Sequence, residues 1–351
     1  MGTIVLTGGG SAGHCTPHLA LLPYLKEYFD KIYYIGSKNG IEKDIIEKEN
    51  IPYFSVPCIK FKRKITLDNL SIPFVLHDGI KKAGKIIDQI KPDVVFSKGG
   101  YVSLPTVIAC KKRKIPVIAH ESDYTVGLAN RISANYCKKI LTAFPETAKN
   151  IKNGEYIGAP IRRELFNASK EKALLSFGFD GKKPVLTVIG GSLGAKKINE
   201  ALRKALDELL PKFDVIHLCG KGNVLDKNKC KGYFQAEYIS NIEDVFSVTD
   251  VCVSRAGSNA LFELMSLKIP CVIVPLPKGI SRGDQLLNAL YFEKLGLVSV
   301  LYQNALTPYS LINYVNSVYA NRFNIQRNFN LNPINDKSPK IADILHAYAK
   351  H

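Results

Sequence analysis

One segment that occurs twice constrains the fold of this chain more than any other feature. Residues 93–118 read DVVFSKGGYVSLPTVIACKKRKIPVI, and residues 250–277 read DVCVSRAGSNALFELMSLKIPCVIVPLP. DVVFSKGG aligns with DVCVSRAG, and KIPVI aligns with KIPCVI. Each copy predicts a buried strand, a glycine turn, a helix and a second strand. The apolar run that opens each copy is typical of a parallel strand covered on both faces.

A strand that runs into a glycine loop precedes each copy. These strands and loops are IVLTGGGSAGH at residues 4–14 and VLTVIGGSLGA at residues 185–195. The pattern predicts two similar doubly wound, Rossmann-like α/β domains, at residues 1–160 and 161–340, with a final helix over 341–351 packing back on the first. Ligands of such sheets bind at the carboxyl ends of the strands, so we expect the site in the cleft between the domains.

Length and composition agree with two soluble domains. The chain has 351 residues, of which 46% are apolar,. Its eight cysteines are scattered without a C-x-x-C pair, which indicates reduced thiols in a cytoplasmic protein and no zinc site,. The chain opens on a core strand without a secretory signal, and no apolar run approaches the ~20 residues of a membrane span.

The net charge of +17 predicts a polyanionic neighbour, namely nucleic acid, anionic lipid or a phosphorylated substrate,. Aromatic residues do not alternate with the basic ones as in nucleic-acid binding proteins. Residues 60–91 hold eight Lys or Arg against three Asp or Glu. Within them, residues 83–90 predict a core-facing helix, whereas the apolar residues 67–76 beside a basic cluster favour docking on an anionic membrane surface.

The first half offers several candidate site residues at strand ends. Glycines of the first loop let backbone N–H groups approach a phosphate. His14 follows this loop and is either a residue that takes part in the chemistry or a capping or packed histidine. Tyr101 follows the next glycine pair. Glu121 and Asp123 follow a later strand, although either could cap a helix instead. The strand over 31–35 lacks the acidic residue of NAD sites, which argues against a dehydrogenase.

In the second half, the turn after residue 253 places Ser258 and Asn259 at a helix start, where an anion is favoured,. Glu263, one turn further on, could accept hydrogen bonds from sugar hydroxyls, so the pattern suits a nucleoside diphosphate. In the alternative interpretation, Ser258 is only a helix cap and Glu263 only a solvated charge. Backbone around Ile239 could line a base pocket, and Gln285 suits a sugar hydroxyl or an ordinary helix start. Residues 321–340, rich in Asn, predict a connection.

Seven motifs in register, GGGSAGH, KGGYVS, HES(D), GAPIR, GGSLGA, SRAGSNALFE and DQLLNA, resemble the MurG family over essentially the whole chain. The resemblance implies a GT-B glycosyltransferase on the inner face of the cytoplasmic membrane. Such an enzyme transfers N-acetylglucosamine from UDP-N-acetylglucosamine to undecaprenyl-pyrophosphoryl-muramoyl-pentapeptide (lipid I), giving lipid II for peptidoglycan. No D-x-D-like motif is present, so we expect no protein-bound metal and no other cofactor.

The resemblance also implies roles for individual residues. In the donor site, Ile239 would recognise uracil, Glu263 the ribose and Gln285 the sugar. The remaining donor positions would be Ser11, Ala12, Gly13, Asp123, Arg162, Ser192, Arg255, Ser258 and Asn259. The acceptor would meet Gly8, Gly9, Gly10, Gly13, His14 and Tyr101. His14 would be the general base, with Glu121 as the alternative,.

The sequence departs from the family pattern at two places. The acceptor-side motif usually reads His-Glu-Gln-Asn, but in this chain Ser122 and Asp123 replace its last two residues. In addition, Asp284 precedes Gln285, at a position where many members carry His or Gln. A UDP-N-acetylglucosamine 2-epimerase is the closest rival, against which the basic segment 60–91 argues. A non-catalytic nucleotide-sugar sensor and a nucleic-acid binding protein are rivals from another class.

Overall fold

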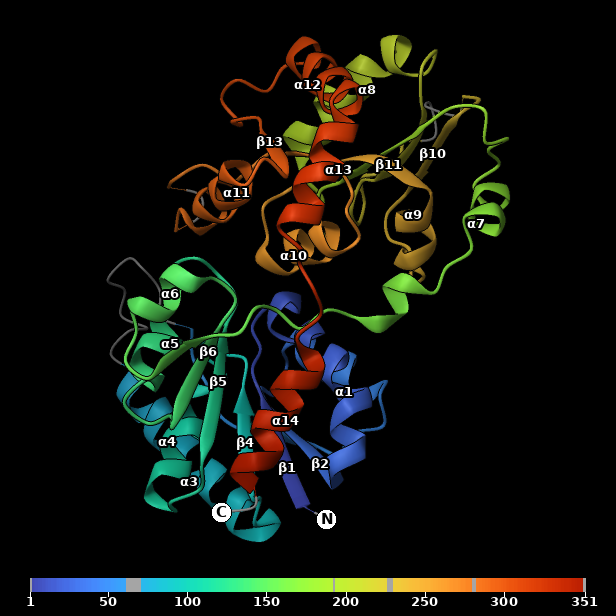
Figure 1. Ribbon diagram of the computed structural model, residues 1–351. Coiled ribbons are helices and arrows are strands. Elements are labelled where there is room, and N and C mark those ends of the chain that lie inside the picture. The colour runs from blue at the N-terminus through green and yellow to red at the C-terminus, as the bar shows by residue number, and fades with distance from the viewer. Residues whose placement is uncertain (1, 61–70, 192, 226–229, 280–281, 350–351) are drawn as a thin grey trace. The chain divides into compact units, whose positions relative to one another are not determined.

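The computed structural model describes residues 2–60, 71–191, 193–225, 230–279 and 282–349. The chain divides into two compact units (Figure 1): unit 1 extends to Arg162 and resumes at Asp336, and unit 2 comprises Arg163–Asn335. We expected divisions after residues 160 and 340. The second falls earlier because the Asp336 carboxylate accepts hydrogen bonds from the Ile161 and Ser338 N–H groups, each at 2.8 Å, and so attaches this segment to unit 1.

Unit 1 contains a parallel sheet with the strand order β3-β2-β1-β4-β5-β6-β7. Its strands are β1 Gly2–Thr7, β2 Phe29–Gly36, β3 Tyr53–Ser55, β4 Val94–Ser97, β5 Val117–Glu121, β6 Lys139–Thr142 and β7 Gly154–Tyr156. Its helices are η1 Ala12–His14, α1 Thr16–Tyr28, α2 Ile41–Glu47, α3 Ile72–Ile90, α4 Leu104–Lys112, α5 Leu128–Ser133, α6 Pro145–Lys149 and α14 Ser338–Ala349.

Helices cover both faces of this sheet (Figure 1), and the alternation of side chains along β1 shows why,. Ile4 and Leu6 point into a core completed by α1 and α14, where Leu345 is fully buried. Val5 points to the opposite face, into a core formed with α3 and α4. The sheet is therefore sandwiched between two apolar layers, as the unbroken apolar strands predicted.

Unit 2 repeats this arrangement with a parallel sheet of order β10-β9-β8-β11-β12-β13. Its strands are β8 Val185–Ile189, β9 Asp214–Leu218, β10 Tyr233–Ala236, β11 Thr249–Ser254, β12 Cys271–Ile273 and β13 Val298–Val300. Its helices are η3 Arg163–Phe166, α7 Lys170–Ser176, α8 Lys196–Leu209, α9 Ile242–Val248, α10 Ser258–Ser266, α11 Asp284–Lys294, α12 Pro308–Ala320 and α13 Arg322–Leu331.

The predicted fold class, two doubly wound α/β domains, is confirmed. One local prediction is wrong: residues 321–340, expected as a connection, contain α13 and the start of α14. Ile325 and Phe329 are four residues apart and both buried, so they form an apolar stripe that holds α13 on unit 2 despite its Asn-rich remainder,.

All eight cysteines are free, and most of them are buried in the cores. No helix in the described part of the chain combines the length and apolarity needed to cross a membrane.

Candidate functional site

In unit 1, the loop after β1 lies against the loops that follow β4 and β2. Gly9 and Gly10 have φ angles of +152° and +83°, and Gly100 has +77°. A Cβ on Gly10 would lie 2.5 Å from the Tyr101 ring, and one on Gly100 would lie 2.4 Å from the Gly9 carbonyl oxygen. Glycine is therefore needed at these positions for its backbone conformation and for close approach. This packing brings together Gly8, Gly9, Gly10 and Tyr101, four of the residues expected to meet the acceptor.

Glu42 on α2 fixes this loop, although the sequence analysis did not identify it. Its fully buried carboxylate accepts hydrogen bonds from the Gly10 and Ser37 N–H groups, both at 3.1 Å, and from the Ser37 hydroxyl. A carboxylate is acceptor-only, so one side chain can satisfy donors of two separate loops. Glu42 thus ties the end of β2 to the glycine loop after β1.

His14 ends the short helix η1 directly after this loop. Its Nδ1 shares a hydrogen bond of 2.8 Å with the Ser11 hydroxyl, and its ring lies near Gly100. Ser11 and Gly13 are exposed beside it. The structure therefore groups His14 with the glycine loop and with Tyr101.

Lys98, the residue after β4, is a second feature that the sequence analysis missed. Its side chain is only 2% exposed; Nζ lies 2.5 Å from His120 Nδ1 and donates to the Ser122 hydroxyl. Burial lowers the pKa of Lys98 to about 7, although the negative charges of Glu121 and Asp123 oppose the shift,. Burial, and then the charge of Lys98, hold the pKa of His120 well below its ordinary value.

His120 is consequently neutral at physiological pH, with a defined tautomer. Nε2 donates to the Gly158 carbonyl oxygen at 2.8 Å, and Nδ1 accepts from Lys98,.

Glu121, the alternative catalytic residue, has both carboxylate oxygens occupied. Oε1 accepts from the Asp123 N–H at 3.1 Å, and Oε2 accepts from the Gly127 N–H at 2.8 Å and the Asn130 amide at 3.0 Å. A nearly buried carboxylate with three N–H donors organises the 122–127 turn rather than accepting a proton from a substrate,. Asp123 and Arg162 are each partly exposed in unit 1.

In unit 2, the second glycine loop lies where β8 and β9 end. Gly194 and Gly220 both have positive φ angles, and a Cβ on Gly220 would lie 2.1 Å from the Gly194 N atom. The two loops touch through their backbones, so this edge of the sheet presents main-chain groups. Ser192, a predicted donor residue, lies outside the described residues.

The predicted donor helix is α10, which begins at Ser258 after Gly257. Asn259 is the second helical residue, and Glu263 lies one turn further on, partly exposed like Asn259. The first N–H groups of a helix lack intrahelical partners and carry the positive end of its dipole. This arrangement can hold an anion at the helix tip and a hydroxyl-bearing group at Glu263.

Arg255, just before α10, is held by two acceptors. Nη1 donates to the Val274 carbonyl oxygen at 3.0 Å, and Nη2 donates to the Gln303 side-chain oxygen at 2.7 Å. Burial lowers the pKa of Arg255 from its ordinary value, but an arginine keeps its charge at neutral pH,. The guanidinium is therefore a fixed cation at the end of β11. The sequence contained no signal that would have identified Gln303.

The other predicted donor residues lie on neighbouring loops of the same edge. Gln285 lies in the first turn of α11, where its side-chain oxygen accepts from the Leu276 N–H at 3.1 Å. Beside it, Leu276 and Gln303 line a pocket of about 370 Å³. Ile239, in the loop after β10, is half-buried against the unit 2 core. Unit 2 thus collects its predicted residues at the carboxyl ends of its strands.

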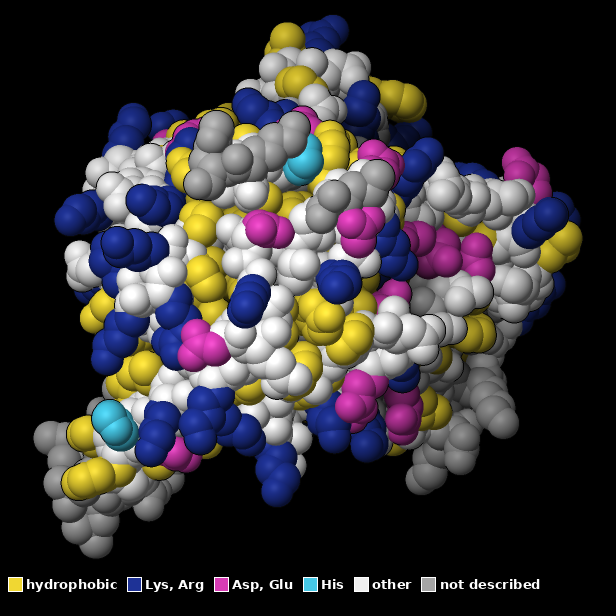
Figure 2. Space-filling view, turned by 90° about the horizontal axis from the view of Figure 1, so that it is seen from below, with side chains coloured by type: hydrophobic (Ala, Val, Ile, Leu, Met, Phe, Trp, Pro, Cys, Tyr) yellow, Lys and Arg dark blue, Asp and Glu magenta, His cyan; other side chains and the backbone are white. Residues whose placement is uncertain are grey.

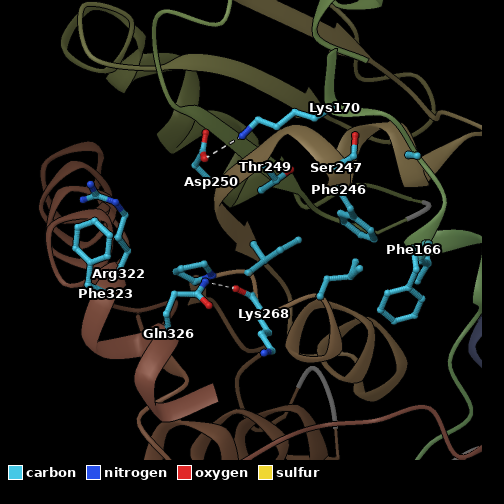
Figure 3. A pocket seen from close by; sticks show the side chains of 15 residues that line it. Phe166, Lys170, Phe246, Ser247, Thr249, Asp250, Lys268, Arg322, Phe323 and Gln326 are labelled. Carbon is cyan, nitrogen blue, oxygen red and sulfur yellow. Dashed lines mark hydrogen bonds and ion pairs between the residues drawn. The ribbon is translucent and has the colours of Figure 1, made fainter. Parts of the chain in front are cut away.

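A larger pocket, of about 540 Å³, opens at the opposite edge of this sheet (Figure 3). It is lined where β11 begins, by Thr249 and Asp250, and before β12, by Pro270. Lys170 pairs with Asp250 across 3.5 Å. None of the sequence-predicted site residues lines this pocket, so its size does not make it the candidate site.

Comparisons with known proteins agree with the division of the chain into two units. The model of the glycosyltransferase family 28 N-terminal domain matches residues 4–142, and that of the family 28 C-terminal domain matches residues 185–344. The fold and the two sets of strand-end loops therefore define a family 28 glycosyltransferase. In fold, the chain is similar to Acinetobacter baumannii MurG, with a TM-score of 0.77 and 23% identity over 98% of this chain and 99% of that one.

Curated relatives narrow the class. A Bacillus thuringiensis (strain Al Hakam) protein named UDP-N-acetylglucosamine–N-acetylmuramyl-(pentapeptide) pyrophosphoryl-undecaprenol N-acetylglucosamine transferase 3 is 51% identical over 92% of each chain. A Clostridium botulinum (strain Hall) transferase of the same name, without the number, is 47% identical over 100% of each chain. The chain belongs to this transferase family, the MurG family. The UDP-GlcNAc 2-epimerase of Neisseria meningitidis shares the fold at 13% identity, with a TM-score of 0.66 over 98% of this chain and 99% of that one.

The role of Glu42 can be tested by replacing it with glutamine. Glu42→Gln leaves one acceptor oxygen and turns an NH2 group toward N–H donors, so we expect unfolding to become easier by about 1–3 kcal/mol. Urea denaturation followed by circular dichroism measures this. Glu47→Gln, an exposed position on the same helix, is the matched control and should change stability by less than about 0.5 kcal/mol,. Equal effects of the two substitutions would contradict the anchoring role.

Proposed function

We propose that this chain transfers N-acetylglucosamine from UDP-N-acetylglucosamine to the C4 hydroxyl of the muramoyl group of lipid I, producing lipid II for peptidoglycan. The observation that carries the proposal is the 51% and 47% identity, over 92% and 100% of the chain, to transferases named for this reaction. The glycine loops in both units support it, because donor and acceptor each carry a diphosphate.

We assign the donor to unit 2. The diphosphate would lie at the start of α10, near Ser258 and Asn259, where the positive end of the helix dipole favours an anion,. Arg255 would add a fixed cation, and Glu263 would accept hydrogen bonds from the ribose. Ile239 would contact uracil through its backbone, and Gln285 would meet the sugar.

We assign the acceptor to unit 1, where the loop of Gly8, Gly9, Gly10 and Gly13 would bind its diphosphate through backbone N–H groups. Tyr101 covers Gly10 and would border the acceptor sugar. His14 would be the general base, held by Ser11. We also propose contacts to the donor from Ser11, Ala12, Gly13, Asp123 and Arg162.

The proposed reaction is a single inverting displacement. The muramoyl hydroxyl oxygen forms a bond to the anomeric carbon while the bond from that carbon to the UDP oxygen breaks, and the hydroxyl proton passes to His14. Negative charge grows on the leaving diphosphate, so the start of α10 and Arg255 stabilise the transition state more than the ground state. Because these groups supply the positive potential, we propose that no protein-bound metal is required.

We further propose that unit 1 docks on the anionic cytoplasmic face of the cell membrane as a peripheral protein. Phe74, in the first turn of α3, is 77% exposed, and Lys81 and Lys85 follow it at helical spacing on one face,. Lys and Arg side chains are spread over the face shown in Figure 2. The predicted docking segment 67–76 lies partly outside the described residues, as do most of the basic residues between 60 and 64.

The function is tested by measuring UDP release from UDP-N-acetylglucosamine with and without a soluble lipid I analogue. We expect release only when the acceptor is present, with a stoichiometric disaccharide product. EDTA should leave the rate unchanged if no metal is required. Release without acceptor, together with N-acetylmannosamine, would instead establish an epimerase.

The general base is tested with His14→Ala. Loss of proton transfer should lower kcat by about 100-fold or more, because general base catalysis typically contributes that much. Glu121→Gln should mainly lower the thermal stability, since the Glu121 carboxylate is satisfied by three N–H donors. A loss of less than ~10-fold in His14→Ala would exclude His14 as the base.

Membrane docking is tested with Phe74→Ser in sedimentation with phosphatidylglycerol vesicles. Burying one Phe is worth ~1.5–3 kcal/mol, so binding should weaken roughly tenfold or more. Phe323→Ser removes a similarly exposed side chain from unit 2, 72% exposed, and is the matched control. Equal binding of the two variants would place the docking surface elsewhere.

A further inference from the structure

Lys98 connects three loops at the candidate acceptor site. Its backbone N–H donates to the Thr7 carbonyl oxygen at 2.9 Å, which fixes it at the end of β1. Gly8 lies so close that an added Cβ would be 3.1 Å from the Lys98 Cβ atom. The side chain then reaches the loop after β5, where it meets His120 and Ser122. A single buried side chain therefore spans the ends of β1, β4 and β5.

Charged and titratable groups surround the ammonium group of Lys98. The carboxylates of Glu121 and Asp123 both act on its ammonium group. The two imidazoles that face it, His120 from β5 and His18 from α1, have pKa values lowered by burial and are neutral at physiological pH. The ammonium of Lys98 therefore offsets two negative charges beside the loop to which we assign a diphosphate.

We propose that Lys98 is a positioning residue for acceptor binding: its ammonium group holds the 122–127 turn through Ser122 and His120 and balances Glu121 and Asp123. This inference rests on the proposed function, because it assigns the acceptor diphosphate to the same loops. Without the cation, its attraction for that diphosphate would be lost, and Ser122 would lose the hydrogen bond from Lys98,.

Titration of Lys98 gives the role a pH signature. Its pKa is lowered to about 7, so the ammonium is present below neutrality and is lost as the pH rises through neutrality. We expect kcat/KM for the acceptor to fall in one step above about pH 7 in the wild-type protein. Lys98→Arg keeps its charge, so its profile should lack this fall across the same range.

The central experiment compares Lys98→Met with Lys111→Met, an exposed lysine of α4 that serves as the matched control. Lys98→Met should lower kcat/KM for the acceptor by roughly tenfold or more and change KM for UDP-N-acetylglucosamine less than about threefold. Ser122→Ala removes the hydroxyl that accepts a hydrogen bond from Lys98 and serves as a second variant. Ser122→Ala should lower kcat/KM for the acceptor in the same direction as Lys98→Met, by about threefold or more.

The outcomes separate this inference from the proposed function. Wild-type protein that transfers no sugar would overturn the function and, with it, this role of Lys98. Active wild type with an unchanged Lys98→Met would overturn the inference alone. If Lys98→Met fails to fold, Ser122→Ala decides: an unchanged kcat/KM for the acceptor overturns the role, and a loss of about threefold or more supports it,.

Discussion

Parallel strand pairing is the constraint on which the rest of this structure depends. Every strand pair described in the two sheets is parallel, so all strands of one sheet end at the same edge,. Thr7 pairs with Ser97, and Ser97 pairs with Ala119, which aligns the ends of β1, β4 and β5. Loops that are far apart in sequence therefore meet, and the candidate site residues of each unit gather at one edge of its sheet.

The sequence predicted those features of the fold that depend on the local pattern of apolar residues and glycines. Apolar runs ending in glycine located β1, β4, β8 and β11, and the repeat of these runs revealed two units. Side chains that act across long sequence distances were missed. Glu42 looks like an ordinary charged helix residue, and only folding shows that it bonds to Gly10. Lys98 resembles other lysines until β4 places it under His120. α13 was missed because only two of its residues, Ile325 and Phe329, are buried, and so short an apolar stripe is a weak helical pattern in the sequence.

The two units treat buried charge differently. Unit 1 encloses charged groups that hold loops together: Glu42 satisfies N–H donors, and Lys98 offsets carboxylates. In unit 2, Arg255 is kept in place by neutral acceptors, Gln303 and the Val274 carbonyl, so its positive charge is not cancelled. A charged side chain that binds other groups of the protein organises a loop. A charged side chain held by neutral acceptors can still attract an anion.

The attachment of α14 to unit 1 has a consequence for biosynthesis. Ile341, Ala342 and Leu345 complete a core whose other members come from the first 160 residues, whereas unit 2 is one continuous segment. At translation rates of about 5–20 residues per second, the ribosome needs on the order of ten seconds or more to make unit 2 between these two parts. During that interval the nascent unit 1 exposes an apolar face that a chaperone could bind. The domain synthesised first is therefore the last to be completed.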